Sequence, residues 1–129
     1  MLTRIILTAL LTLGSAGFAQ AENKIVCTHY VYADVPFATV NLHLLPNGHI
    51  DRLGEITHYG QTKTTSVEEH QARDGELYNM TVDADSGGNG LQLIVSQKDS
   101  NGGKEATLIN QASPIMKEMP GICTMNAAL

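Results

Sequence analysis

Three side chains suited to metal binding or acid–base chemistry occur on either side of one Pro-Asn-Gly turn. They are His43, His49 and Asp51. Two histidines and a carboxylate are acceptable zinc ligands, and a bound metal could assist a reaction on that face. The chain has no His-x-His or His-x-x-x-His pair here, and Leu45 is expected between the two histidines on their own strand face. A weak metal-binding or metal-assisted site is therefore one hypothesis for this segment.

The turn supports a second hypothesis, the polar face of an ordinary β-hairpin. Proline suits the second position of a type I turn, and glycine suits the left-handed position that closes a three-residue loop. Such a loop pairs Leu44 with Ile50 and His43 with Asp51, so the apolar residues of both strands share one face. The two histidines and Asp51 then share the other face. This register predicts a solvated cross-strand pair between His43 and Asp51.

Other motifs for catalysis or ligand binding are absent from the sequence. There is no Gly-x-Ser-x-Gly elbow, phosphate loop or dinucleotide fingerprint. The segment DADSGGNG, residues 83–90, lacks oxygen ligands at the fifth and twelfth positions of a calcium loop, which are Gly87 and Ile94. Glu68 and Glu69 are adjacent, so on a strand they point to opposite faces and cannot act as a pair. We therefore expect a protein that is not an enzyme and needs no cofactor.

The N-terminus has the pattern of a secretory signal peptide. Arg4 precedes an apolar run from Ile5 to Leu13, and small residues end at Ala19-Gln20-Ala21. The run is shorter than the roughly 20 residues that a membrane-spanning helix needs. The sequence therefore predicts a signal peptide at residues 1–21, a single domain at residues 22–129, and a periplasmic or secreted location. No stable membrane insertion is expected after cleavage.

The two cysteines lie near the two ends of the predicted domain. They are Cys27 and Cys123, and in an exported protein such a pair usually forms a disulfide. A redox pair would be expected as Cys-x-x-Cys. The disulfide in turn predicts that the first and last strands are neighbours, since bridged Cα atoms lie within about 7 Å of each other.

The charge balance argues against a nucleic-acid partner. The chain carries 8 basic and 13 acidic residues, for a formal net charge of −5, and it has no basic run. Phosphate backbones are bound by clustered Lys and Arg side chains. We expect a partner that is a protein or a component of the cell envelope.

Turn signals recur at short intervals and predict an all-β fold. Between them, apolar and polar residues alternate with the period of a strand. Hairpin-length links make neighbouring strands antiparallel, and a disulfide between the ends favours a small up-and-down barrel of about eight strands over a β-sandwich. One helical turn is expected at Ser113–Met119. The predicted strands lie near residues 24–33, 37–45, 49–59, 62–71, 76–84, 91–98, 104–110 and 121–125.

The interior of this barrel is expected to be filled by side chains rather than to hold a ligand. Eight strands enclose a space that side chains just fill, and the inward candidates are mostly large. Recognition is then expected on the outer surface or the loops. The inward candidates are Val40, Leu42, Leu44, Ile50, Tyr78, Met80, Val82, Leu91, Leu93, Val95, Ala106 and Leu108.

The segment QTKTTSVEEHQARDGE, residues 61–76, departs from the pattern because Val67 is almost its only core-quality residue. A strand with two polar faces is weakly specified, so this segment is expected to be a solvated hairpin or to line a wet opening. Loops on a rigid scaffold often carry function. The candidate partner-binding residues are therefore Lys63, Glu68, Glu69, His70, Arg73 and Asp74.

Two short motifs resemble those of the periplasmic inhibitors of C-type lysozyme. Asp74-Gly75-Glu76-Leu77-Tyr78 resembles the Ser-Gly-x-x-Tyr motif of that family, with Asp74 in place of serine, and residues 103–108 match Gly-x-x-Ala-x-Leu. The chain has no tryptophan, whereas the family has one before the second motif. The resemblance implies a small exported barrel. The function expected from the sequence is an exported, non-enzymatic binding module, with inhibition of a hydrolase such as lysozyme, or metal binding, as alternatives.

Overall fold

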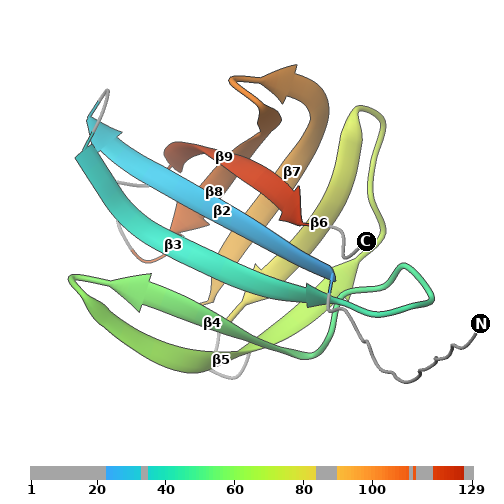
Figure 1. Ribbon diagram of the computed structural model, residues 1–129, viewed down its shortest axis with the longest axis horizontal. Coiled ribbons are helices and arrows are strands. Elements are labelled where there is room, and N and C mark those ends of the chain that lie inside the picture. Colours follow the sequence, from blue (N-terminus) through green and yellow to red (C-terminus); the bar gives the residue numbers. More distant parts are fainter. Residues whose placement is uncertain (1–22, 33–34, 84–89, 111, 113–117, 127–129) are drawn as a thin grey trace, which may run out of the picture.

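A computed structural model describes residues 23–32, 35–83, 90–110, 112 and 118–126. Within these ranges every regular element is a β-strand (Figure 1). The predicted helical turn at Ser113–Met119 falls largely on residues 113–117, outside the described residues, and Met119 belongs to the last strand. The strands are β2 (Asn23–Tyr32), β3 (Val35–Leu44), β4 (Leu53–His58), β5 (Gln61–His70), β6 (Glu76–Val82), β7 (Leu91–Ser100), β8 (Gly103–Asn110) and β9 (Glu118–Asn126).

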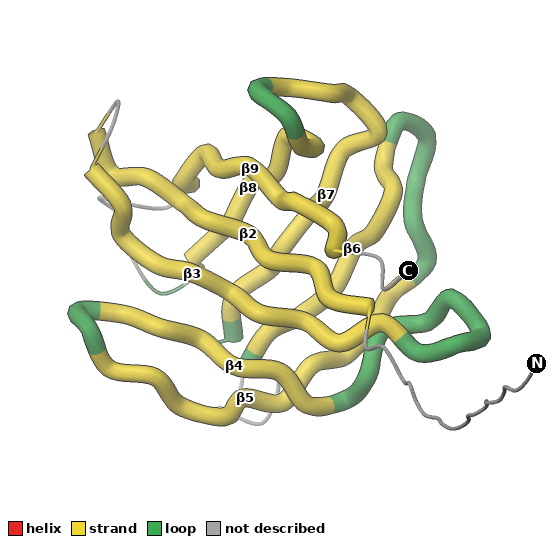
Figure 2. The backbone as a smooth tube through the Cα atoms, viewed as in Figure 1, coloured by secondary structure: helices red, strands yellow, loops and turns green. Residues whose placement is uncertain are grey.

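The eight strands form one closed antiparallel barrel, as the turn spacing predicted. Each strand pairs with the next along the chain, and β9 pairs with β2 to close the sheet (Figure 2). Closure pairs every strand with a neighbour on both sides for at least part of its length, which reduces the edge through which a small β protein could associate. The described residues contain no helix that is long and apolar enough to cross a membrane.

The predicted disulfide lies at the seam where the barrel closes. Cys27 of β2 and Cys123 of β9 face each other in register and are bonded, with 96 residues between them in sequence. Both cysteines are fully buried. The bond is consistent with an oxidising, extracellular compartment.

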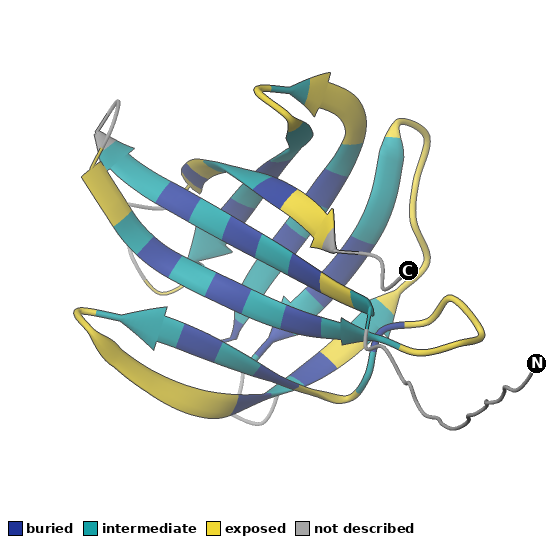
Figure 3. Cartoon of the chain, viewed as in Figure 1, coloured by how far each residue is buried: buried dark blue, intermediate teal, exposed yellow. Residues whose placement is uncertain are grey.

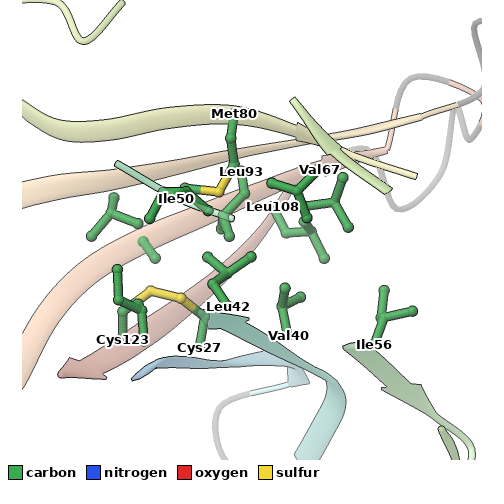
Figure 4. Close-up of a cluster of buried hydrophobic side chains, with 14 of the residues drawn as sticks. Cys27, Val40, Leu42, Ile50, Ile56, Val67, Met80, Leu93, Leu108 and Cys123 are labelled. Carbon is green, nitrogen blue, oxygen red and sulfur yellow. A yellow bond between two sulfur atoms is a disulfide. The ribbon is translucent and has the colours of Figure 1, made fainter. Parts of the chain in front are cut away.

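Side chains from all eight strands meet inside the barrel as one apolar cluster (Figure 4). Buried and less buried residues alternate along β2 and β3, as expected when one face of a strand points inward (Figure 3). All twelve predicted inward residues belong to this cluster or pack against it. The sequence prediction did not include ten other described residues whose side chains are buried, which are Ile25, Cys27, His29, Ala38, Ile56, Thr65, Val67, Asn79, Met119 and Cys123.

The Pro-Asn-Gly turn has the register expected from the sequence. The backbone N–H of Leu45 donates to the carbonyl of His49 at 2.8 Å, and the N–H of Asp51 donates to the carbonyl of His43 at 2.8 Å. Leu44 pairs with Ile50 between these two bonds. The regular strand β4 begins only at Leu53, so the connection between β3 and β4 is longer than the three-residue turn alone.

Candidate functional site

The structure places the two proposed histidine ligands, His43 and His49, against two different carboxylates. His43 Nε2 lies 3.0 and 3.2 Å from the carboxylate oxygens of Glu55, on the neighbouring strand β4. His49 Nδ1 lies 3.3 Å from Oε1 of Glu69, on β5. Among the described residues, no three His, Cys, Asp or Glu side chains are grouped so that they could hold a metal ion. The two histidines therefore contact separate carboxylates.

Glu69 attaches the connection between β3 and β4 to the barrel wall. Its Oε1 accepts a hydrogen bond from the backbone N–H of Ile50 at 2.9 Å, and the Ile50 side chain is only 6% exposed. The hydroxyl of Tyr78 donates to the carbonyl of Gly48 at 3.5 Å. Burial, and then the negative charge of Glu69, raise the pKa of Tyr78. Glu69 thus has a structural role that accounts for its position in the polar segment.

The other candidate partner-binding residues do not form one surface. Lys63 lies near the start of β5, where its ammonium is 3.9 Å from a carboxylate oxygen of Asp83. His70 lies at the end of β5, with Nε2 2.6 Å from Thr81 Oγ1. At about 3.3 Å per residue, the backbones of these two positions are roughly 23 Å apart. The remaining candidates, Glu68, Arg73 and Asp74, are exposed and lie toward the His70 end.

The strand β5 itself is part of the barrel wall. It pairs with β4 from Gln61 to Ser66 and with β6 from Val67 to His70, and Thr65 and Val67 are buried. Residues 61–64 are all exposed and pair only with β4, which agrees with the expected solvated hairpin, whereas the second half of the strand is built into the barrel wall. The connection at residues 71–75 is likewise exposed along its whole length.

The most unusual exposed residue is Tyr59, in the turn between β4 and β5. His58 pairs with Gln61, which leaves Tyr59-Gly60 as a two-residue hairpin loop. Their φ angles are 53° and 74°, so both residues are left-handed, as in a type I′ turn. Such turns favour Asn-Gly, because a larger side chain costs about 1–2 kcal/mol in the left-handed region. The Tyr59 side chain is nevertheless 84% exposed to solvent.

Two neighbouring rings hold Tyr59 in place. The ring of His58 stacks on Tyr59 with a centroid separation of 4.0 Å, and Phe37 meets the rings of His58 and Tyr59 at 4.4 and 6.1 Å. His58 Nε2 is buried and has no hydrogen-bond partner among the described residues. The exposed ring is therefore supported from behind by an aromatic contact rather than free to rotate in solvent.

A groove of about 430 Å³ lies beside this cluster. It opens where the ends of two hairpins separate, because β3 continues to Val35 while β4 stops at His58 (Figure 1). Its volume falls within the usual range of ligand pockets, about 300–1,000 Å³. No charged side chain of the described residues lines it. The lining includes Val31, Val35, Pro36 and Phe37 from one hairpin and Thr57 and Tyr59 from the other.

The fold and this site define a closed, disulfide-linked β-barrel with an exposed aromatic end. No family model matches the sequence, and neither a curated protein nor a solved structure matches it.

Proposed function

We propose that this protein is an exported, non-enzymatic binding module that recognises a protein partner through Val35, Phe37, His58 and Tyr59, together called the Tyr59 surface. The observation that carries the proposal is the exposed Tyr59 side chain at φ 53°. Strained backbone in proteins concentrates at functional sites, where the surrounding structure maintains it. A glycine or asparagine would make the same turn at lower cost, so stability alone does not explain the tyrosine.

The physical character of the surface suits a protein partner. Large, rigid aromatic side chains dominate the binding energy of protein interfaces, because they bury much area and lose little conformational freedom. Val35 is also 48% exposed, which adds apolar area next to the groove. The described part of the lining has no charged residue, which favours an apolar segment of the partner over an anionic or cationic ligand.

Inhibition of a hydrolase is a more specific form of the same function. The Tyr59-Gly60 turn is a narrow two-residue hairpin end with an aromatic side chain exposed on it, and a shape of this kind can enter an enzyme cleft. The Asp74-Gly75 motif forms a separate turn between β5 and β6, closed by a bond from Glu76 N–H to the Arg73 carbonyl. Lysozymes and proteases that keep full activity at high molar excess of the protein would exclude this form.

The proposal is tested by replacing Tyr59 with residues that suit its backbone. Tyr59→Asn and Tyr59→Gly remove the ring but favour the type I′ turn, so the free energy of unfolding should be unchanged or rise by up to about 1–2 kcal/mol. We expect both variants to lose the partner that the wild-type protein captures from envelope extract or culture fluid.

The matched control is Leu53→Ser, which removes another exposed apolar side chain, 56% exposed and at the opposite end of β4. This variant should retain the partner. Capture that is equal for wild type and both Tyr59 variants, or that is lost equally in Leu53→Ser, would contradict the proposal.

A further inference from the structure

A second and larger groove, of about 900 Å³, lies on the outer surface of β8 and β9. Its wall includes Tyr30 of β2, Ser96 of β7, Thr107 of β8 and Ile122 of β9. These four strands are consecutive in the closed barrel, in the order β7, β8, β9 and β2. The groove is distinct in chemistry from the one beside Tyr59, although both touch the end of the hairpin formed by β2 and β3.

An irregularity in β7 accounts for a hollow on a face that would otherwise be convex. Val95 pairs with Ala106 and Asp99 with Lys104, so three residues of β7 oppose the single residue Glu105 of β8. Extra residues in one strand bend it and increase its twist. Figure 1 shows the outer end of the hairpin between β7 and β8 turning sharply relative to the rest of these strands.

The lining combines apolar surface with neutral hydrogen-bonding groups. Pro120 and Ile122 supply apolar surface, and Tyr30 supplies an aromatic ring with a hydroxyl. Hydroxyl and amide groups come from Ser96, Ser100, Asn101 and Thr107. Glu105 is the one charged residue of the lining among the described residues, and its carboxylate lies 3.7 Å from the ammonium of Lys98.

These features exclude several kinds of ligand. An extended peptide binds to a sheet through a free strand edge. The pairing of β2 with β9 ends at His29 and Gly121, so the edges left free at this groove are short, at residues 30–32 and 118–120, and Pro120 has no N–H to donate. An anionic ligand would meet no Lys or Arg in the described lining, on a chain of formal net charge −5. A purely apolar ligand would cover the polar groups of Ser100, Asn101 and Thr107 without hydrogen-bonding to them. The Ser96 hydroxyl already bonds to the Gly75 carbonyl and to the Lys98 N–H.

We propose that this groove binds a neutral glycan chain. Sugar rings have apolar faces that suit the tyrosine, proline and isoleucine side chains, and equatorial hydroxyls that suit the serine, threonine and asparagine groups. The groove is open to solvent and runs across several strands, so it accepts part of a longer chain rather than enclosing a single small molecule. This site is independent of the Tyr59 surface, and the two proposals can fail separately.

The test is an NMR titration of the isotopically labelled protein with neutral hexasaccharides at millimolar concentration. The probes are cellohexaose, xylohexaose, maltohexaose and chitohexaose, and an oligogalacturonate is the anionic control. At least one neutral probe should shift the amide signals of Ser96, Thr107 and Ile122, while the anionic control should not. An extended peptide is titrated as a second control. If no neutral probe shifts these signals, or if only the peptide does, the proposal is overturned.

Two variants locate the binding. Tyr30→Ala should raise the dissociation constant of the bound hexasaccharide by about tenfold or more. Tyr30→Phe keeps the ring, so its dissociation constant should stay closer to that of wild type. Thr107→Val keeps the shape of an outward strand residue and should also weaken binding, so the test does not depend on the folding of Tyr30→Ala. Tyr59→Gly should bind the glycan as wild type does. Equal affinity in wild type, Tyr30→Ala and Thr107→Val would overturn the assignment of the groove.

Discussion

A buried histidine makes the stability of this barrel sensitive to mild acid. His29 points into the interior from β2 and is fully buried. Its Nδ1–H donates to the carbonyl of Met119 at 3.3 Å, and its Nε2 has no hydrogen-bond partner among the described residues. A proton on Nε2 would place a positive charge in an apolar interior. Burial therefore lowers the pKa of His29 from 6.5 to about 4, partly opposed by hydrogen bonds to the backbone of Met119 and Pro120.

The size of the effect follows from the difference between the folded and unfolded pKa values. Above pH 6.5 both states hold a neutral His29, so its full contribution to stability is present. Between pH 6.5 and about 4 the unfolded chain binds a proton that the folded barrel does not, and the free energy of unfolding falls. The slope is at most about 1.4 kcal/mol per pH unit, which gives a total loss of about 3 kcal/mol over this window.

Urea unfolding at a series of pH values between 7 and 4 measures this loss. His29→Gln keeps an N–H that can donate to the Met119 carbonyl but does not titrate. We expect the variant to be less stable than wild type at pH 7 and to approach it as the pH falls, so the difference between them shrinks by about 3 kcal/mol. His70→Gln, which replaces an exposed histidine, is the control. The difference in free energy of unfolding between this variant and wild type should be the same at every pH of the series. A difference between wild type and His29→Gln that is constant from pH 7 to 4 would refute the reasoning.

Three further predictions concern the contacts that hold the barrel together. Replacing both Cys27 and Cys123 by alanine should lower the free energy of unfolding by about 4–5 kcal/mol, because the bond closes a loop of 96 residues. In chemical denaturation, a reductant should lower the stability of wild type but not that of this variant. Gly121→Ala would place a Cβ 2.4 Å from His29 Nδ1 and 2.5 Å from the Thr28 carbonyl oxygen. The free energy of unfolding measured by calorimetry should therefore fall by about 1–3 kcal/mol. An unchanged melting temperature would contradict this packing. Glu69→Ala removes the acceptor of the buried Ile50 N–H, so the free energy of unfolding should fall by about 1–3 kcal/mol. Hydrogen exchange at residues 45–52 should also become faster. Glu68 is the exposed neighbour, and Glu68→Ala should change neither the stability nor the exchange.

The barrel could be predicted because its signals are local in sequence. Glycine and asparagine turns at short spacing fix the strand number, and the period-two pattern of β3, β6 and β7 identifies their inner faces. The Pro-Asn-Gly turn also fixed the register of its hairpin. The two cysteines, at opposite ends of the chain, supplied the long-range constraint that placed the first and last strands together.

The burial of His29 could not be predicted in the same way because β2 is apolar on both faces. Ile25 and Cys27 alternate with Val26, and His29 with Tyr30, so hydrophobicity alone does not separate the inner face from the outer face. The disulfide could have resolved this. A buried Cys27 places every second residue inward, and that series includes His29.

Tyr59 was missed because of a one-residue difference in the turn. The sequence pattern predicts strands at 49–59 and 62–71, which would put Tyr59 at the end of a strand and centre the turn one residue later. In the structure His58 pairs with Gln61, so Tyr59 enters the loop in the left-handed conformation. A tyrosine is rare at this position of a type I′ turn, and turn preferences therefore argue for the wrong register. The same rarity makes Tyr59 informative once the structure is known.

Site-specific photo-crosslinking tests the central claim, that Tyr59 contacts a protein partner, most directly. Benzoylphenylalanine in place of Tyr59 keeps an aromatic side chain at the exposed hairpin end, and the same analogue at His70 is an exposed control at the other end of β5. On irradiation in the native extract, we expect a single covalent protein adduct from position 59 that excess unlabelled wild-type protein suppresses, and no such adduct from position 70. The absence of a protein adduct at position 59, or the same adducts from both positions, would contradict the account.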